Sequence, residues 1–163
     1  MGTVWKATHS RLKQPVAVKF ISRDEITVTL AQRFVREGRA TASVRHRNVV
    51  EVLDFGTTGE GTPFLVMEWL EGEPLDARLH RSPPLTLPEL TAIVSEVLSG
   101  LTAVHAAGVI HRDIKPSNLY LVTDSEGVHP KIVDFGVSRL QAHLLQDYEG
   151  TLTDTGQIVG SPI

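Results

Sequence analysis

The sequence contains no cysteine, which excludes disulfide bonds, thiol catalysis and thiolate metal sites. The formal net charge is only -3, so nothing suggests a nucleic acid or an anionic membrane as the main partner. No apolar run approaches the roughly 20 residues that cross a bilayer, and the N-terminus lacks the apolar segment of a signal peptide. We therefore expect no membrane segment in this chain and a cytoplasmic protein.

The composition is that of an ordinary globular domain. Apolar residues make up 41% of the 163 residues and charged residues 21%, which favours one domain with a real core over a disordered chain or a coiled coil.

The most informative stretch is residues 111–118, with the sequence His-Arg-Asp-Ile-Lys-Pro-Ser-Asn. It combines an acid, basic side chains and an amide, and Pro116 favours a non-helical turn. Apolar runs at 104–110 and 119–122 flank it. A loop held between two buried elements keeps polar side chains at fixed distances, as a catalytic loop must.

Hydrophobic periodicity predicts the elements of the first half of the chain. Alternation at 1–7 and 15–21 indicates an antiparallel hairpin, and residues 29–44 fit an amphipathic helix. Two strand-like runs follow at 49–55 and 63–70, joined by a Gly-rich turn.

The second half reads mainly as helix followed by a hairpin. A short helix is expected at 75–80, and a longer one begins at Thr86 or Pro88, runs to His105 and ends at Ala107-Gly108. Short strands at 119–122 and 131–133 would form a hairpin around a connection, residues 123–130, that is rich in turn residues.

Four separated motifs of this chain resemble those of the eukaryotic-like protein kinases and occur in that family's order. They are the end of a Gly-rich loop at Gly2 and Val4, the strand lysine in Val-Ala-Val-Lys at 16–19, the loop at 111–118, and Asp-Phe-Gly at 134–136. The resemblance implies an α+β, kinase-like two-lobe fold. It would have an antiparallel N-lobe sheet with one helix and the first part of a mainly helical C-lobe.

The resemblance implies a serine/threonine protein kinase that transfers the γ-phosphoryl group of ATP to a protein hydroxyl. Lys115 favours the serine/threonine class, and the phrases at 68–72 and 114–118 look like bacterial members. In the family pattern Asp113 is the catalytic base, Lys115 lies near the transferred phosphate, and Lys19 pairs with the nucleotide phosphates. Asn118 and Asp134 would be ligands of Mg²⁺ or Mn²⁺.

The family's nucleotide site maps onto ten positions here. These are Gly2, Val4, Ala17, Lys19, Glu37, Met67, Glu68, Leu70, Tyr120 and Asp134. Met67 would lie at the back of the adenine pocket and residues 68–70 would form the hinge, although Met67 and Trp69 could equally be ordinary core residues. Glu37 would pair with Lys19; the alternative is a surface carboxylate that pairs with Arg33 or Arg36.

Other residues near these motifs have less specific readings. A second Asp-Phe-Gly at 54–56 ends an earlier predicted strand, so we expect Asp54 to make a turn. His111 is expected to be structural, and Arg112 to receive a phosphorylated residue. Residues 137–163 resemble an activation segment, with phosphorylation candidates at Thr151, Thr153 and Thr155.

The resemblance divides residues 1–163 into a partial kinase domain. Residues 1–70 would be an N-lobe lacking its first strand, and 71–163 the start of a C-lobe through the activation segment. The helices that follow in the family would be missing, so an apolar stripe would face water. Leaving this surface exposed costs a free energy of about 25 cal/mol per Å². We expect the chain alone to be poorly stable, to aggregate, or to bind a partner through that face. The alternative to a kinase is a truncated, inactive kinase-like module that binds nucleotide or a protein.

Overall fold

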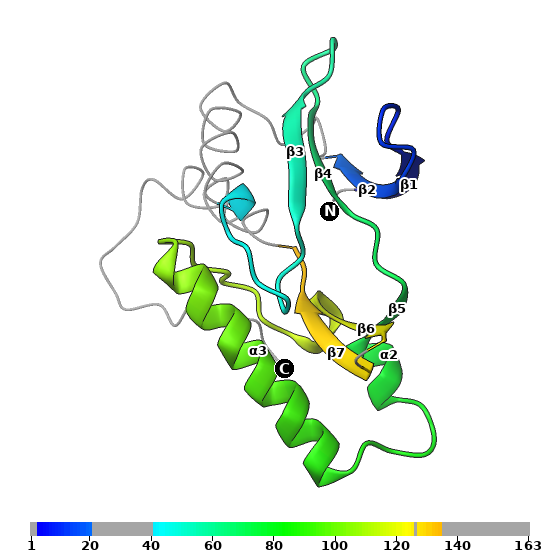
Figure 1. Cartoon of the computed structure of the whole chain (residues 1–163), viewed down its shortest axis with the longest axis vertical. Helices are drawn as coiled ribbons and strands as arrows, with labels where there is room; N and C mark the ends of the chain where they lie inside the picture. The colour runs from blue at the N-terminus through cyan, green and yellow to red at the C-terminus, as the bar shows by residue number, and fades with distance from the viewer. Residues whose placement is uncertain (1–2, 21–40, 126, 135–163) are drawn as a thin grey trace, which may run out of the picture.

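The computed structural model describes residues 3–20, 41–125 and 127–134, in which two small sheets lie one above the other (Figure 1). The first sheet is formed by β1 (Thr3–Thr8), β2 (Pro15–Phe20), β3 (Val52–Thr57) and β4 (Pro63–Glu68). The second part contains β5 (Gly72–Pro74), α2 (Leu75–Leu79), α3 (Leu87–Ala106), the 3-10 helix η2 (Pro116–Asn118), β6 (Leu119–Asp124) and β7 (Gly127–Ile132).

The first sheet is antiparallel, with the strand order β1-β2-β4-β3. The predicted hairpin is confirmed, since β1 pairs with β2 from Thr3 opposite Phe20 to Thr8 opposite Pro15. Alternation places Ala17 and Lys19 among the buried positions of β2, where they face the same side of the sheet. Alternation along β2 therefore places the Lys19 side chain in the interior. A buried ammonium group requires an anionic partner.

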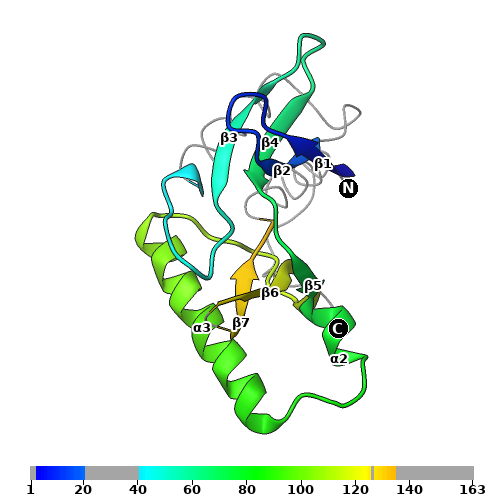
Figure 2. The same cartoon turned by 45° about the vertical axis from the view of Figure 1, so that its right-hand side comes forward.

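The second sheet has the order β5-β6-β7, and α3 packs against β7 (Figure 2). Helix α3 begins at a capping box, in which Thr86 accepts from the Glu89 backbone N–H and the Glu89 carboxylate accepts from Thr86. These hydrogen bonds to the Thr86 side chain and backbone lower the pKa of Glu89. The helix ends as predicted, followed by Gly108 in the left-handed region with φ 72°.

Helix α3 presents two apolar faces. Ile93, Val97, Gly100 and Val104 are buried against the rest of the chain. Leu87, Val94 and Leu98 lie on another face and are more than half exposed. With 20 residues and a mean hydropathy of 1.3, α3 is also the one described helix that is long and apolar enough to cross a membrane. A face packed on β7 is typical of the core helix of a folded domain, so this indication is weak.

The two sheets are joined by a segment that belongs to both. Asn48 and Val50 exchange backbone hydrogen bonds with Ile132 of β7, at 2.8 and 3.0 Å, and Val49 forms a parallel bridge with Ile132. The Asn48 side chain donates to Glu96 Oε2 at 2.7 Å and to the Pro130 carbonyl at 2.9 Å. Two residues later the same segment enters β3 of the upper sheet. Buried valines 49, 50 and 52 therefore form a continuous core between the sheets.

Two local predictions are wrong. The connection expected at 123–130 is mostly strand: β6 extends to Asp124 and β7 begins at Gly127. Its Gly, His and Pro residues suggested a turn, but β7 is an edge strand, where proline is tolerated. Asp54 lies within β3, next to a register shift between Val52 and Asp54, and does not end a strand. The helix expected at 29–44 and the segment at 137–163 lie outside the described residues, apart from 41–44 at the end of the former.

Candidate active site

The loop at 111–118 is closed by the side chain of Asn118. Its Nδ2 donates to the Asp113 backbone oxygen at 2.8 Å and to Asp113 Oδ2 at 3.0 Å. Lys115 Nζ lies 2.8 Å from the same Oδ2. Pro116 opens the short helix η2, which carries Asn118 back toward Asp113. Two donors on one oxygen hold the Asp113 carboxylate in a fixed orientation.

His111 supports this loop from below and is only 1% exposed. Its Nε2 lies 2.8 Å from the Val133 carbonyl oxygen, and its Nδ1 accepts from the Asp113 backbone N–H at 3.3 Å. This pattern defines a neutral ring with the proton on Nε2. Burial lowers the pKa of His111, since desolvation disfavours the charged ring more than the hydrogen bond to Val133 favours it. The geometry is that of a structural histidine.

Lys19 of β2 pairs with the aspartate of the Asp-Phe-Gly at 134–136. Lys19 Nζ lies 2.7 Å from Asp134 Oδ1, and the Lys19 side chain is 9% exposed. Asp134 has φ 66°, in the left-handed region, and directly follows Val133. The Val133 N–H donates to the Asn118 backbone oxygen at 2.9 Å, so the loop and the ion pair are joined through one residue.

A pocket of about 290 Å³ lies beside this ion pair, between the two sheets. We call it the interlobe pocket; its walls are Val4, Ala17, Val50, Met67, Glu68, Trp69, Leu70, Tyr120, Val133 and Asp134. Most of these side chains are apolar, as expected for a planar aromatic ligand. Lys6 of β1 lies over the Trp69 ring, with Nζ 4.4 Å from its centroid, so a cation–π contact ties β1 to the segment after β4.

The structure brings most of the residues singled out from the sequence into one place. The interlobe pocket contains seven of them, namely Val4, Ala17, Met67, Glu68, Leu70, Tyr120 and Asp134. Lys19 reaches it through Asp134, and Asp113, Lys115 and Asn118 form the adjoining cluster. Gly2 and Glu37 lie outside the described residues, so the predicted Lys19–Glu37 pair does too.

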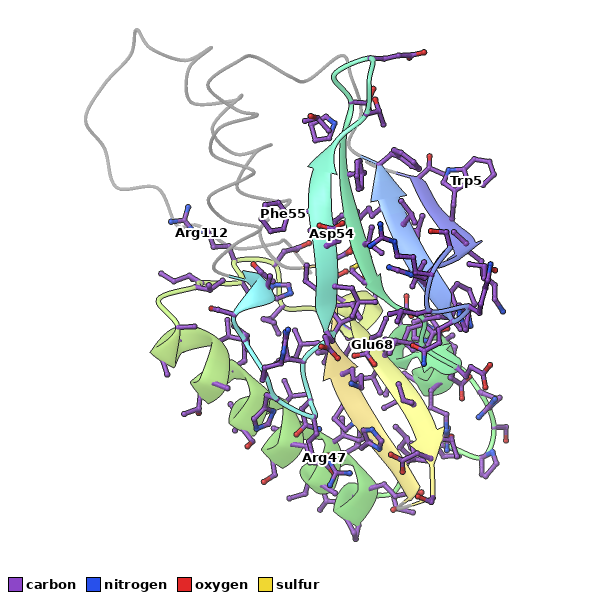
Figure 3. The ribbon with its side chains drawn as sticks, turned by 45° about the horizontal axis from the view of Figure 1, so that its top comes forward. Trp5, Arg47, Asp54, Phe55, Glu68 and Arg112 are labelled. Carbon is purple, nitrogen blue, oxygen red and sulfur yellow. The ribbon has the colours of Figure 1, made fainter. Side chains whose placement is uncertain are left out.

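Sequence reasoning missed several residues of this region. Val133 was detectable as a neighbour of the predicted site residue Asp134, whereas Val50 carries no signal because it lies in an ordinary apolar run. Trp69, which belongs to the predicted hinge at 68–70, lines the pocket. Lys131 was also missed: its Nζ lies 2.7 Å from Glu68 Oε1. Asp54, from the other Asp-Phe-Gly, is exposed on β3, where its Oδ1 accepts from the adjacent Phe55 N–H (Figure 3).

A larger cavity, of about 630 Å³, lies elsewhere, between α2, α3 and the second sheet. None of the predicted site residues that the structure describes lines it. Its charged residues are already engaged, for example Arg81 with Glu73 at 2.7 Å and Glu89 in the capping box. Size alone therefore does not identify the site, and the convergence of charged groups at the interlobe pocket does.

Two side chains beside the pocket have the chemistry of magnesium ligands. Among the described residues, both hydrogen bonds of the Asn118 side chain use Nδ2, so its Oδ1 could serve as a ligand atom, and Asp134 could offer Oδ2 while its Oδ1 pairs with Lys19. Within the described ranges no three His, Asp or Glu side chains form a metal cluster. Two hard oxygen ligands, completed by phosphate oxygens and water, suit Mg²⁺ or Mn²⁺.

The two sheets and the site between them have the arrangement expected of a protein kinase domain, and the comparisons agree. The family model for the protein kinase domain matches residues 1–154, so the chain belongs to the protein kinase family. It is 37% identical to the serine/threonine-protein kinase pkn3 of Myxococcus xanthus, over 99% of this chain and 30% of that protein. It is 36% identical to PknA of Mycobacterium tuberculosis, over 99% of this chain and 36% of that protein.

A solved structure shares the fold. The PknI kinase domain of Mycobacterium tuberculosis matches with a TM-score of 0.72 and 29% identity, over 84% of this chain and 55% of that one. The predicted family and the two-lobe fold class are confirmed. The chain therefore spans only about a third of the length of pkn3 and of PknA.

Proposed function

We propose that this chain is the catalytic region of a bacterial-type serine/threonine protein kinase, which transfers the γ-phosphoryl group of ATP to a protein Ser or Thr hydroxyl. One observation carries the proposal: Asp134 is paired with Lys19 and, through Val133, is hydrogen-bonded to the loop that holds Asp113. Residues far apart in the sequence thus meet beside one pocket of a size that fits an adenine ring.

The charged side chains have separate roles in the transfer. Asp113 accepts the proton of the substrate hydroxyl while the oxygen of that hydroxyl forms a bond to the γ-phosphorus. At the same time the bond between the γ-phosphorus and the β–γ bridging oxygen breaks, and ADP leaves. Lys115 lies 2.8 Å from Asp113 and would offset the charge on the transferred group. Lys19 would hold the nucleotide phosphates in line with the hydroxyl.

Asn118 and Asp134 would hold Mg²⁺ or Mn²⁺, which when bound offsets the negative charge of the phosphates. Removing divalent metal with EDTA should therefore abolish phosphotransfer, and adding Mg²⁺ back should restore it. Adenosine carries no phosphate, so its binding should not change. Phosphotransfer that persists in EDTA would contradict this role.

We further propose a cytoplasmic location, and that the outer face of α3 binds a partner. On this face Leu87, Val94 and Leu98 are 77%, 54% and 57% exposed. An apolar stripe of this kind marks a contact surface. Binding of a hydrophobic dye to the 163-residue chain should fall when Val94 and Leu98 are both replaced by Ser; unchanged dye binding would contradict the proposal.

The direct test of the proposed function is transfer of label from γ-labelled ATP to a generic basic protein. Asp113→Asn and Lys19→Met should each abolish label uptake. A thermal shift with Mg-ATP in the unmodified chain without label transfer would instead support a nucleotide-binding module without activity. No response to nucleotide would refute both.

A further inference from the structure

The carboxylate of Glu68 joins three parts of the molecule. Its Oε1 accepts from the Glu51 backbone N–H at 2.8 Å and lies 2.7 Å from Lys131 Nζ. The Glu68 backbone N–H in turn donates to the Glu51 oxygen at 3.0 Å. Figure 3 shows Glu68 at the junction, where the upper sheet meets the end of β7. Glu68 also lines the interlobe pocket.

Lys131 lies on β7, the strand that leads directly into another part of the pocket wall. It lies two residues before Val133 and three before Asp134, both of which follow β7 and line the pocket. The ion pair therefore connects one part of the wall, formed by the end of β4 and residues 69–70, to the strand that carries Val133 and Asp134. Both partners are largely shielded, with side-chain exposures of 15% for Lys131 and 28% for Glu68.

The shielding makes this pair stronger than an ordinary surface salt bridge. Charge-assisted hydrogen bonds are about twice as strong as neutral ones, and partial burial reduces their screening by salt. The second donor, Glu51 N–H, fixes the carboxylate so that Lys131 meets it in one geometry. Breaking the pair would leave the Glu51 contact in place but release β7 from the carboxylate.

We propose that Lys131 is a positioning residue for adenine binding: through Glu68 it fixes the distance between the hinge segment and the Val133–Asp134 wall of the pocket. This inference rests on the proposed function, because it assumes that the pocket binds the adenine of ATP. A flat ring binds most tightly when both walls of the pocket are already held at contact distance, because no binding free energy is then spent on ordering them.

The two tryptophans allow a direct measurement. Trp69 lines the pocket, whereas Trp5 is exposed on β1, so Trp5→Phe leaves a single reporter in the hinge segment. In this background the fluorescence of Trp69 is titrated with adenosine and, separately, with Mg-ATP. Lys131→Met should weaken adenosine binding by roughly fivefold, the effect of losing about 1 kcal/mol. Lys131→Arg keeps the charge and should restore most of the affinity.

Two comparisons separate positioning from general damage. Arg81→Met breaks another ion pair of the same 2.7 Å length, with Glu73, outside the interlobe pocket, and should leave adenosine affinity unchanged. Glu68→Gln should weaken adenosine binding, and adding Lys131→Met to it should cost little more, because both changes remove the same contact. In phosphotransfer, Lys131→Met should raise KM for ATP while kcat stays the same.

The failures are distinguishable. If the Trp5→Phe chain binds adenosine and Lys131→Met binds it equally well, the positioning role is refuted and the kinase function stands. If Lys131→Met and Arg81→Met weaken binding alike, the effect is not specific to this pair, which also refutes it. If the Trp5→Phe chain binds neither adenosine nor Mg-ATP, the proposed function itself fails and this inference falls with it.

Discussion

Lys19 Nζ lies 2.7 Å from Asp134 Oδ1, although the two residues are 115 positions apart in the sequence. The lysine is a buried residue near the end of β2, and the aspartate lines the interlobe pocket. A buried ammonium group requires such a partner, because leaving it unpaired in the interior is costly. The contact therefore ties the upper sheet to the segment that follows β7, at the place where phosphates are expected.

Asp134→Asn should lower the rate of phosphotransfer by roughly 10²- to 10³-fold, because a neutral amide holds a divalent metal poorly and no longer pairs with Lys19. The chain supplies its own control. Asp54→Asn alters the aspartate of the other Asp-Phe-Gly, which is exposed on β3, and should leave the rate unchanged. Equal losses from the two substitutions in a labelled-ATP assay would contradict the assignment of Asp134.

Asp113→Asn should reduce kcat by roughly 10²- to 10⁴-fold with little change in KM for ATP, because the amide cannot take the hydroxyl proton but keeps the shape of the side chain. Initial rates at several ATP concentrations separate the two parameters. A variant that loses ATP affinity while it keeps kcat would show that Asp113 serves the nucleotide and is no base.

His111 should make the chain less stable in acid. Its pKa in the folded state is lowered from 6.5 by burial, so below about pH 6.5 the unfolded chain takes up a proton that the folded chain refuses. The contribution of the neutral His111 ring to the free energy of unfolding is complete above pH 6.5. It is lost as the pH falls, by at most about 1.4 kcal/mol per pH unit. Urea unfolding between pH 5 and 8, the interval that brackets the ordinary histidine pKa, measures this slope.

The slope, and not the absolute stability, is the readout for His111. His111→Gln should flatten it, whereas His105→Gln, at the exposed end of α3, should leave it intact. If His111→Gln unfolds with the same pH slope as the unmodified chain, the neutral buried ring is not its source.

Gly100→Ala should destabilise the chain by about 1–2 kcal/mol, even though alanine favours a helix. An added Cβ would lie 3.0 Å from the Asn48 carbonyl oxygen and 3.0 Å from Ile132 Cδ1, at the point where α3 meets the segment joining the sheets. Gly59→Ala is the matched control, since nothing lies within 4 Å of its added Cβ. The measurement is the midpoint temperature of thermal unfolding for both variants. Similar midpoints for Gly100→Ala and Gly59→Ala would mean that α3 does not pack this closely.

The sequence predicted best those features that depend on local patterns. The apolar repeat, with Thr86 or Pro88 as its start and Ala107-Gly108 as its end, located α3 almost to the residue, because such start and stop residues are chemical signals within one or two turns. Alternation likewise located β1 and β2. The extent of β6 and β7 was missed, because Pro130 and Gly127 are poor strand residues whose pairing depends on the neighbouring strand and on Asn48.

For the site, the resemblance of the loop at 111–118 to the family pattern indicated Asp113, Lys115 and Asn118, and the structure places Lys115 and Asn118 in contact with the Asp113 carboxylate. Lys131 could not be predicted in this way. Its significance lies only in the 2.7 Å contact with Glu68, 63 residues away, and an isolated lysine in a strand carries no signal for such a partner.

The segment that pairs with β7 before it enters β3 affects how the polypeptide would respond to cleavage. A protease cut after Leu70, at the expected boundary between residues 1–70 and 71–163, would sever the backbone but not the hydrogen bonds of Asn48 and Val50 to Ile132. Val49 and Val50 would remain buried beside that strand. The two fragments should therefore stay together as a nicked complex and migrate as one species on native gel filtration, separating only in denaturant.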